Sequence, residues 1–263
     1  MRDLVVIRGA GDIASGTIAK LHASGFPVIV LECERPSAIR RKVAFSEAVY
    51  AGQITIEGIT ACLTSKSEIE NILYSGKIPV VVDPDCTILK EWKPKILVDG
   101  ILAKKNMGTT RDMADITIGL GPGFTAGEDV DAVIETMRGH NLGRIYYSGQ
   151  AIPNTGKPAK IGGYDKERVI YSPVDGIVRC PGRIGEQINR GEQIARIGEL
   201  PVRAEISGIL RGILPEGFRA TKGCKMADID PRLEEKENCN TISDKARCIA
   251  GGVLEAILCL ENK

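Results

Sequence analysis

The chain has 263 residues, 43% of them hydrophobic and 26% charged, which excludes a disordered chain and predicts about two domains. Because 35 Lys and Arg residues balance 34 Asp and Glu, the net charge of +1 gives no global attraction for nucleic acid, and aromatic residues, at 4%, are too few for base stacking. No apolar run reaches the roughly 18 residues of a membrane span, and residues 1–7 read as the start of a strand rather than a signal peptide. We therefore expect a cytoplasmic protein that binds neither nucleic acid nor membranes.

From residue 1 to 155, apolar runs of strand length alternate with helix-like stretches, a pattern typical of βαβ units. The predicted strands are Leu4–Arg8, Val28–Glu32, Ile78–Val82, Ile96–Asp99, Ile116–Leu120 and Arg144–Tyr147. The predicted helices are Asp12–Ser24, Lys66–Tyr74 and Glu128–Met137, the last with four apolar residues on one face. Residues 36–63 are expected to form a short helix and an alternating strand. Together these elements predict an α/β fold whose first domain, 1–155, is a Rossmann-like, mostly parallel sheet.

Residues 150–168, rich in Gly, Pro and Asn, are predicted to be a linker, and an internal repeat follows it. Pro173–Ile197 aligns with Glu205–Ile229 at an offset of 32 residues without a gap, and seven positions are identical. Each copy predicts a few short strands joined by glycine turns, so two copies would close a small all-β domain over 168–232. This domain resembles the barrel-sandwich hybrid fold of biotinyl and lipoyl carriers, but its central turn, Glu199–Arg203, has no lysine to modify. We therefore expect a scaffold or docking surface.

A C-terminal helix is predicted within 240–263, with Ser243 as its N-cap. The eight cysteines form no CxxC pair or ligand-like group, so no metal site is predicted. No nucleophile elbow or two-histidine spacing is present, and the catalytic residues, if any, are unknown. Cys86, beside Asp85, is expected to be an inert buried thiol, and the alternative is a reactive thiol or a sulfur relay. Whether the chain is an enzyme, and whether it forms a homo-oligomer, stays open at this point.

A glycine-rich segment directly after the first predicted strand is the strongest candidate binding site. It matches G-x-G-x-x-A, and its predicted ligand-binding residues are Gly9, Ala10, Gly11, Asp12, Ile13, Ala14, Ser15 and Gly16. In this context the glycines allow a pyrophosphate to approach the backbone, and the helix N–H groups face the anion. Glu32, at the end of the next strand, is placed to bond a ribose hydroxyl. The alternative is a glycine turn that serves packing only.

Other predicted site residues lie in loops that follow neighbouring strands, because ligands of open parallel sheets bind beyond the carboxyl ends of the strands. Lys104 and Lys105 are candidates to neutralise phosphates, and Asn106 is a candidate hydrogen-bond donor. Gly121 and Gly123 are expected to let their loop approach the ligand closely. A solvated basic turn is an equally good explanation of the lysines. On these residues the small-molecule partner is a nucleotide, NAD or NADP.

Several segments in the same order resemble the YqeB family. They are Val6–Gly16, Ala103–Thr109, Gly119–Gly127, Ile134–His140, Pro153–Gly156 and Ser243–Arg247. Members are regarded as accessory proteins of selenium-dependent molybdenum hydroxylases, akin to the XdhC/CoxI maturation factors. The resemblance implies a maturation factor whose partner is a molybdenum hydroxylase apoenzyme. Its glycine loop would then hold molybdopterin cytosine dinucleotide instead of NAD(P), whereas the alternative function is an NAD(P)-dependent oxidoreductase.

Overall fold

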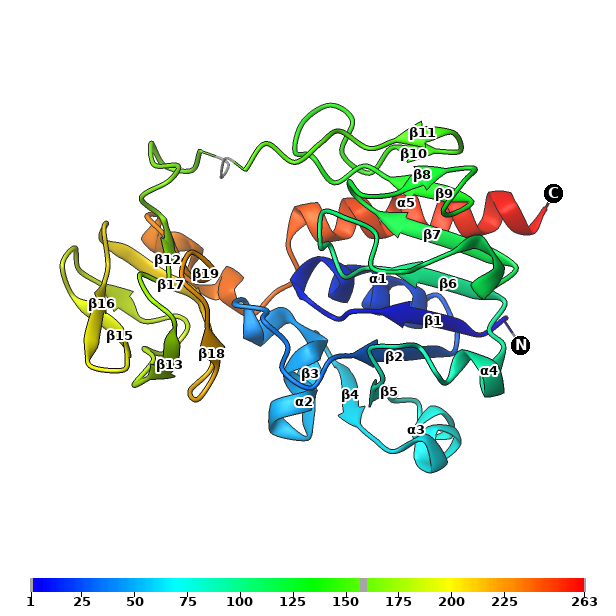
Figure 1. Ribbon diagram of the computed structural model, residues 1–263, viewed down its shortest axis with the longest axis horizontal. Helices are drawn as coiled ribbons and strands as arrows, with labels where there is room; N and C mark the ends of the chain where they lie inside the picture. The colour runs from blue at the N-terminus through cyan, green and yellow to red at the C-terminus, as the bar shows by residue number, and fades with distance from the viewer. Residues whose placement is uncertain (1, 157–159, 263) are drawn as a thin grey trace. The chain divides into compact units, whose positions relative to one another are not determined.

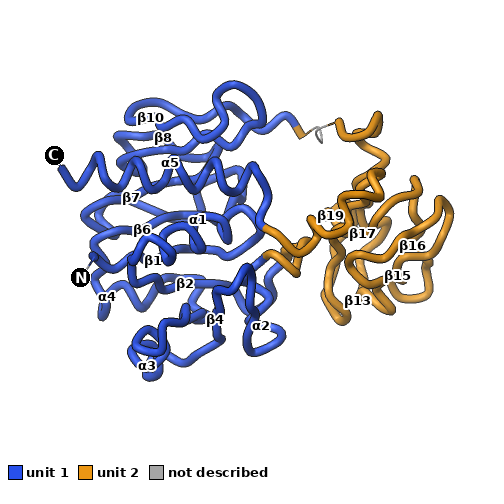
Figure 2. The backbone as a smooth tube through the Cα atoms, turned by 180° about the vertical axis from the view of Figure 1, so that it is seen from behind, with its two compact units in different colours: residues 1–36, 44–155, 242–263 blue, residues 37–43, 156–241 orange. Residues whose placement is uncertain are grey.

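The computed structural model describes residues 2–156 and 160–262, so part of the predicted 150–168 linker lies outside the described residues (Figure 1). The chain divides into two compact units, coloured separately in Figure 2. Unit 1 comprises 1–36, 44–155 and 242–263, and unit 2 comprises 37–43 and 156–241. The C-terminal segment therefore belongs to the same unit as the glycine loop.

Unit 1 is built on a nine-stranded sheet with the order β10-β9-β7-β6-β1-β2-β5-β4-β3. The seven inner strands pair in parallel, whereas the edge strands β3 and β10 pair antiparallel. The strands are β1 (Val5–Arg8), β2 (Val28–Glu32), β3 (Gln53–Ile56), β4 (Ile59–Leu63), β5 (Ile78–Val82), β6 (Ile96–Asp99), β7 (Ile116–Leu120), β9 (Ala132–Ile134) and β10 (Ile145–Tyr146). Beside them, β8 (Thr125–Ala126) pairs with β11 (Gly149–Gln150) as a separate two-stranded sheet.

Helices cover both faces of this sheet, but unequally. The helices are α1 (Asp12–Ala23), α2 (Ala48–Ala51), α3 (Ile69–Tyr74), α4 (Leu89–Trp92) and α5 (Asp244–Glu261). The long helices α1 and α5 lie side by side and pack on one face, where Val5 and Ile7 of β1 point (Figures 1 and 2). Val6 points to the other face, against residues of α3 and α4. The continuous apolar runs of the inner strands follow from this burial on both faces.

The Rossmann-like prediction is wrong. A Rossmann domain has two βαβαβ halves whose crossovers are helices. In the described chain α1 joins β1 to β2, but no α-helix joins β6 to β7 or β7 to β9, and the sheet is mixed. The predicted helix Glu128–Met137 is instead strand β9 with flanking turns. The fold is thus a mixed α/β sheet with additional antiparallel sheets, and the C-terminal helix belongs to the same unit as the large sheet.

Unit 2 contains two four-stranded antiparallel sheets, ordered β12-β19-β17-β14 and β16-β15-β13-β18. The strands are β12 (Val169–Tyr171), β13 (Gly176–Arg179), β14 (Gln187–Ile188), β15 (Gln193–Ile197), β16 (Leu200–Arg203), β17 (Gly208–Ile213), β18 (Arg219–Ala220) and β19 (Lys225–Asp230). The sequence repeat is visible here, since β17, β18 and β19 start 32 residues after β13, β14 and β15. Each short strand pairs across the repeat, β14 with β17 and β18 with β13, so the two copies share one core.

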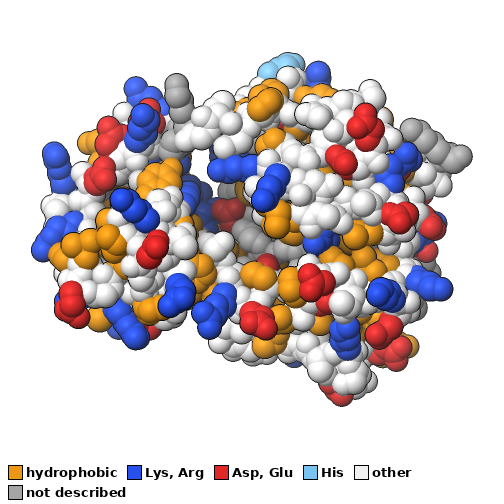
Figure 3. Space-filling model, in the orientation of Figure 1, with side chains coloured by type: hydrophobic (Ala, Val, Ile, Leu, Met, Phe, Trp, Pro, Cys, Tyr) orange, Lys and Arg blue, Asp and Glu red, His pale blue; other side chains and the backbone are white. Residues whose placement is uncertain are grey.

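Segment 37–43 joins unit 2 although it is distant in sequence. The Ile213 N–H donates to the Ile39 carbonyl at 2.9 Å, and Arg41 Nε donates to the Ile213 carbonyl at 3.1 Å. On the face shown in Figure 3, Lys and Arg side chains are interspersed with Asp and Glu. No helix within 2–156 and 160–262 combines the length and the apolar character that crossing a membrane requires.

Candidate functional site

Loops that follow the inner strands meet at the carboxyl edge of the large sheet, as the sequence predicted. Gly9, directly after β1, has φ +82°, and a Cβ there would lie 3.0 Å from the Ile101 Cα in the loop after β6. Gly123, in the loop after β7, has φ +116°, and a Cβ there would lie 2.6 Å from the Lys105 Cα. A side chain at Gly121 would meet Thr136 at 2.5 Å. Glycine is thus required where these three loops touch.

The start of α1 is open. Gly11 is its N-cap residue, no side-chain hydrogen bond caps the helix, and a Cβ on Gly11 would have no neighbour within 4 Å. The first N–H groups of a helix lack intrahelical partners and favour an anion. Asp12 lies in this first turn and opposes an anion. The N–H groups at this helix start suit a phosphate group, and the Asp12 carboxylate lies in the same turn.

Glu32 is bonded to the glycine loop itself. Its Oε2 accepts from the Ala10 N–H at 2.8 Å, and its Oε1 accepts from the Cys33 N–H at 2.8 Å. The Ala10 N–H is therefore already hydrogen-bonded within the protein. Because a carboxylate has about four acceptor positions, Glu32 retains capacity for a ribose hydroxyl.

The second half of the motif faces the protein interior. Ser15 Oγ donates to the Ala10 carbonyl at 3.1 Å and accepts from the Phe45 N–H at 2.9 Å. A Cβ on Gly16 would lie 2.7 Å from the Ala246 carbonyl oxygen of α5, and a Cβ on Gly100 would lie 2.8 Å from the Ala14 Cβ. Ile13 is partly buried against the same core. These residues support the glycine loop from the protein interior. Their contact with a ligand stays a prediction.

The lysine loop after β6 is rigidly built but exposes its charges. Lys104 and Lys105 are exposed, whereas the amide of Asn106 is bonded within the loop. Its Nδ2 donates to the Thr109 carbonyl at 2.7 Å, and its Oδ1 accepts from the Gly108 and Thr109 N–H groups at 2.9 and 2.8 Å. Asn106 therefore fixes the loop, and the lysines are its available cations.

A buried ionic cluster lies under this loop, and the sequence patterns did not predict it. Arg8, at the end of β1, bonds Asp99 at the end of β6 and also Thr109, and all three are at most 6% exposed. The available signal was a charged residue ending an otherwise fully apolar strand, since buried charges need partners. The described residues contain no group of three or more His, Cys, Asp or Glu able to hold a metal ion.

Asp83 and Cys86 line the same edge, after β5. Burial alone would raise the pKa of Asp83, but hydrogen bonds from the Ile88 N–H at 2.8 Å and from Thr87 hold it below its ordinary value. Burial raises the pKa of the Cys86 thiol to about 11, although the Arg8 charge opposes this. Cys86 is therefore a protonated thiol at neutral pH.

Acid should loosen the Asp83 loop. Because the folded pKa of Asp83 is lowered, its carboxylate stabilises the fold above its unfolded pKa of about 4, and this contribution is lost as the pH falls through the folded value. Asp83→Asn should cost about 1–2 kcal/mol at pH 7, because one acceptor is lost, and should flatten the acid limb. Thermal unfolding from pH 2.5 to 7 measures both effects. Parallel pH curves for the variant and the wild type would contradict this assignment.

The chain resembles a curated protein over nearly its whole length. No family model matches it. It is 52% identical over 261 residues to the uncharacterized protein YqeB of Escherichia coli K12, which covers 99% of this chain and 48% of that protein. The chain thus spans about half the length of this curated relative.

Similarity to solved structures is weak. A succinylglutamate desuccinylase/aspartoacylase of Rhodobacter sphaeroides matches with a TM-score of 0.30 and 13% identity, over 88% of this chain and 85% of that one. The product-bound ectoine utilization protein EutE (DoeB) of Ruegeria pomeroyi matches with a TM-score of 0.21 and 12% identity, over 86% and 52%. Neither likeness reaches a level that supports inference about this chain. The 52% identity to YqeB over nearly the whole chain agrees with the resemblance of its segments to the YqeB family.

Proposed function

We propose that this chain is a nucleotide-binding accessory factor in the maturation of a molybdenum hydroxylase. The observation that supports nucleotide binding is the uncapped start of α1 beside open space at Gly11. The role in maturation is supported by the resemblance to the YqeB family, whose members are regarded as accessory to selenium-dependent molybdenum hydroxylases. The hydroxylase apoenzyme is accordingly the proposed protein partner.

The residues at the carboxyl edge fit the diphosphate and ribose of a dinucleotide. The N–H groups at the start of α1 would hold a phosphate, and Glu32 would accept from a ribose hydroxyl with its remaining lone pairs. Lys104 and Lys105, on the loop that contacts Gly9 and Gly123, would offset the repulsion from Asp12. Molybdopterin cytosine dinucleotide and NAD(P) share this diphosphate–ribose unit, so the same residues serve either ligand.

Substitutions at Gly11 test nucleotide binding directly. Gly11→Asp and Gly11→Asn both place an N-cap side chain at the open end of α1, so neither should destabilise the fold. A carboxylate about 4–5 Å from a phosphate costs about 3–4 kcal/mol at an effective dielectric of 20, so Gly11→Asp should weaken binding at least 100-fold. Gly11→Asn lacks the charge, but its side chain accepts from the same N–H groups that would bind the phosphate. It should therefore weaken binding about 10-fold.

Thermal shift and calorimetry with NAD(H), NADP(H), CTP and molybdopterin cytosine dinucleotide provide the measurement, since a ligand at 100 times its Kd adds about 2.7 kcal/mol of stability. Unchanged binding in both variants would remove the glycine loop from the site. Stabilisation by NADP(H) alone, with an absorbance change at the nicotinamide band on adding substrates, would instead favour the oxidoreductase.

For the maturation role, loss of this protein should lower the hydroxylase activity of cells without lowering the amount of the hydroxylase polypeptide.

A further inference from the structure

A buried guanidinium beneath the glycine loop is not used by the proposed nucleotide contacts. Arg8 directly precedes Gly9 and is 6% exposed. Its Nη1 donates to Thr109 Oγ1 at 2.5 Å and to Asp99 Oδ2 at 3.3 Å. Its Nη2 donates to the carbonyls of Pro84 at 3.2 Å and Met107 at 3.4 Å. One side chain therefore joins the end of β1 to the loops that follow β5 and β6.

The loop after β6 has a backbone that needs such support. Leu102 and Lys104 have φ values of +59° and +65°, in the left-handed region that side chains disfavour. Conformations of this kind persist only where the surroundings hold them. At its start, the Ile101 N–H donates to Asp99 Oδ1 at 3.0 Å. At its end, Thr109 Oγ1 donates to Asp99 Oδ2 at 2.6 Å, so Arg8 and Asp99 hold the base of the loop.

We propose that Arg8 is a positioning residue that presets the loop 100–109, and with it Lys104 and Lys105, before any ligand arrives. The part of this inference that concerns phosphate rests on the proposed nucleotide binding. A loop already held in its bound shape avoids the ordering cost of binding, so its lysines bind an anion more tightly than the same lysines on a mobile loop. Arg8 acts on the loop and not on the ligand in this proposal, because both of its Nη atoms are bonded to Asp99, Thr109 and two loop carbonyls.

The test compares variants that remove bonds of this cluster with a variant that keeps them. Thr109→Val removes the hydroxyl that bonds both Arg8 and Asp99, whereas Thr109→Ser retains it. Arg8→Lys keeps the charge but loses the fork that reaches two loops. Native trypsin cleavage at Lys104 and Lys105, followed by mass spectrometry, reports loop opening. We expect cleavage to rise at least 10-fold in Thr109→Val and Arg8→Lys, and less than 2-fold in Thr109→Ser.

Ile249→Val, in the core of α5, controls for global destabilisation. Cleavage at Lys104 and Lys105 that rises as much in this variant, or that does not rise in Thr109→Val, would overturn the proposal. Calorimetry with CTP completes the test, with an expected 5–20-fold loss of affinity in Thr109→Val and none in Thr109→Ser. If the wild type binds no CTP while the cleavage pattern holds, the nucleotide proposal fails for that probe and the positioning role of Arg8 stands.

Discussion

A Gly16→Val variant is expected to lose about 3 kcal/mol of unfolding free energy, the upper part of the range for overpacking. A Cβ at Gly16 would lie 2.7 Å from the carbonyl oxygen and 2.8 Å from the carbonyl carbon of Ala246. Both are backbone atoms of α5, so no side-chain rotation relieves the clash, and α1 or α5 must shift against the sheet. For a unit of this size the melting temperature should fall by about 6–12 °C, which calorimetry measures.

Gly11→Ala is the control within the same motif. Gly11 has φ −62° and ψ 177°, which any residue adopts, and a Cβ there meets no atom within 4 Å. Its cost should stay below about 1 kcal/mol, the difference between glycine and alanine as N-caps. An equal loss of stability in both variants would contradict the division of the motif into an open end at Gly11 and a packed end at Gly16.

The sequence predicted most strands of the large sheet because continuous apolar runs of four or five residues mark strands buried on both faces. The strands confirmed with their bounds are Val28–Glu32, Ile78–Val82, Ile96–Asp99 and Ile116–Leu120. The C-terminal helix is also confirmed, and its predicted N-cap, Ser243, accepts from the Ala246 N–H at 3.2 Å. These elements are specified by local pattern and local hydrogen bonding.

The errors arose where local pattern is ambiguous. The run from Val130 to Ile134 fits one face of a helix and also a short buried strand, and it is the buried strand β9 that pairs with β7. Without that helix, the described connections between the parallel strands β6, β7 and β9 contain no α-helix, which a Rossmann domain requires. The position of α5 beside α1 was equally inaccessible, because it depends on contacts between Gly16 and Ala246, 230 residues apart.

For the site, topology was predictable and bonding was not. Parallel pairing alone brings the loops after β1, β6 and β7 to one edge, and the structure shows them in contact. The bond from Arg8 to Thr109 spans 101 residues and leaves no periodic trace in the sequence. The bond from Ala10 to Glu32 gives that carboxylate a structural task which a motif match does not reveal.

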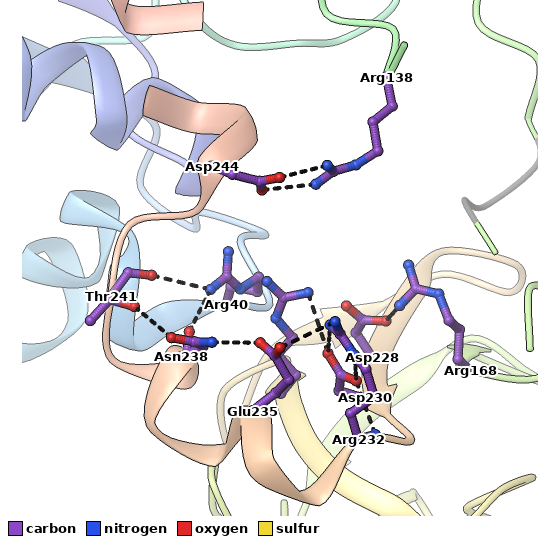
Figure 4. Close-up of polar contacts among 11 residues, drawn as sticks. Arg40, Arg138, Arg168, Asp228, Asp230, Arg232, Glu235, Asn238, Thr241 and Asp244 are labelled. Atoms are coloured by element: carbon purple, nitrogen blue, oxygen red, sulfur yellow. Dashed lines mark hydrogen bonds and ion pairs between the residues drawn. The ribbon is translucent and has the colours of Figure 1, made fainter. Parts of the chain in front are cut away.

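The largest loss of unfolding free energy in unit 2 is expected when the buried ion pair of Arg168 and Asp228 is broken. Arg168 is 7% exposed and Asp228 4%, and Arg168 Nη1 donates to Asp228 Oδ1 (Figure 4). The pair lies where β12 attaches to β19, since the Ile229 N–H donates to the Arg168 carbonyl at 2.8 Å. Removing one member of a buried pair leaves a charge without its counterion, so Asp228→Leu should cost about 3–5 kcal/mol.

Two further variants separate charge from packing. Arg168→Met/Asp228→Leu removes both charges and should recover most of the loss, because apolar side chains of similar volume replace buried ion pairs at little cost. Arg179→Met breaks an exposed pair with Glu216 and should change stability by less than about 1 kcal/mol. Hydrogen exchange at β12 and β19 measures the effect within unit 2. If the double variant exchanged as fast as Asp228→Leu, the loss would come from packing, and the buried charge would not be its cause.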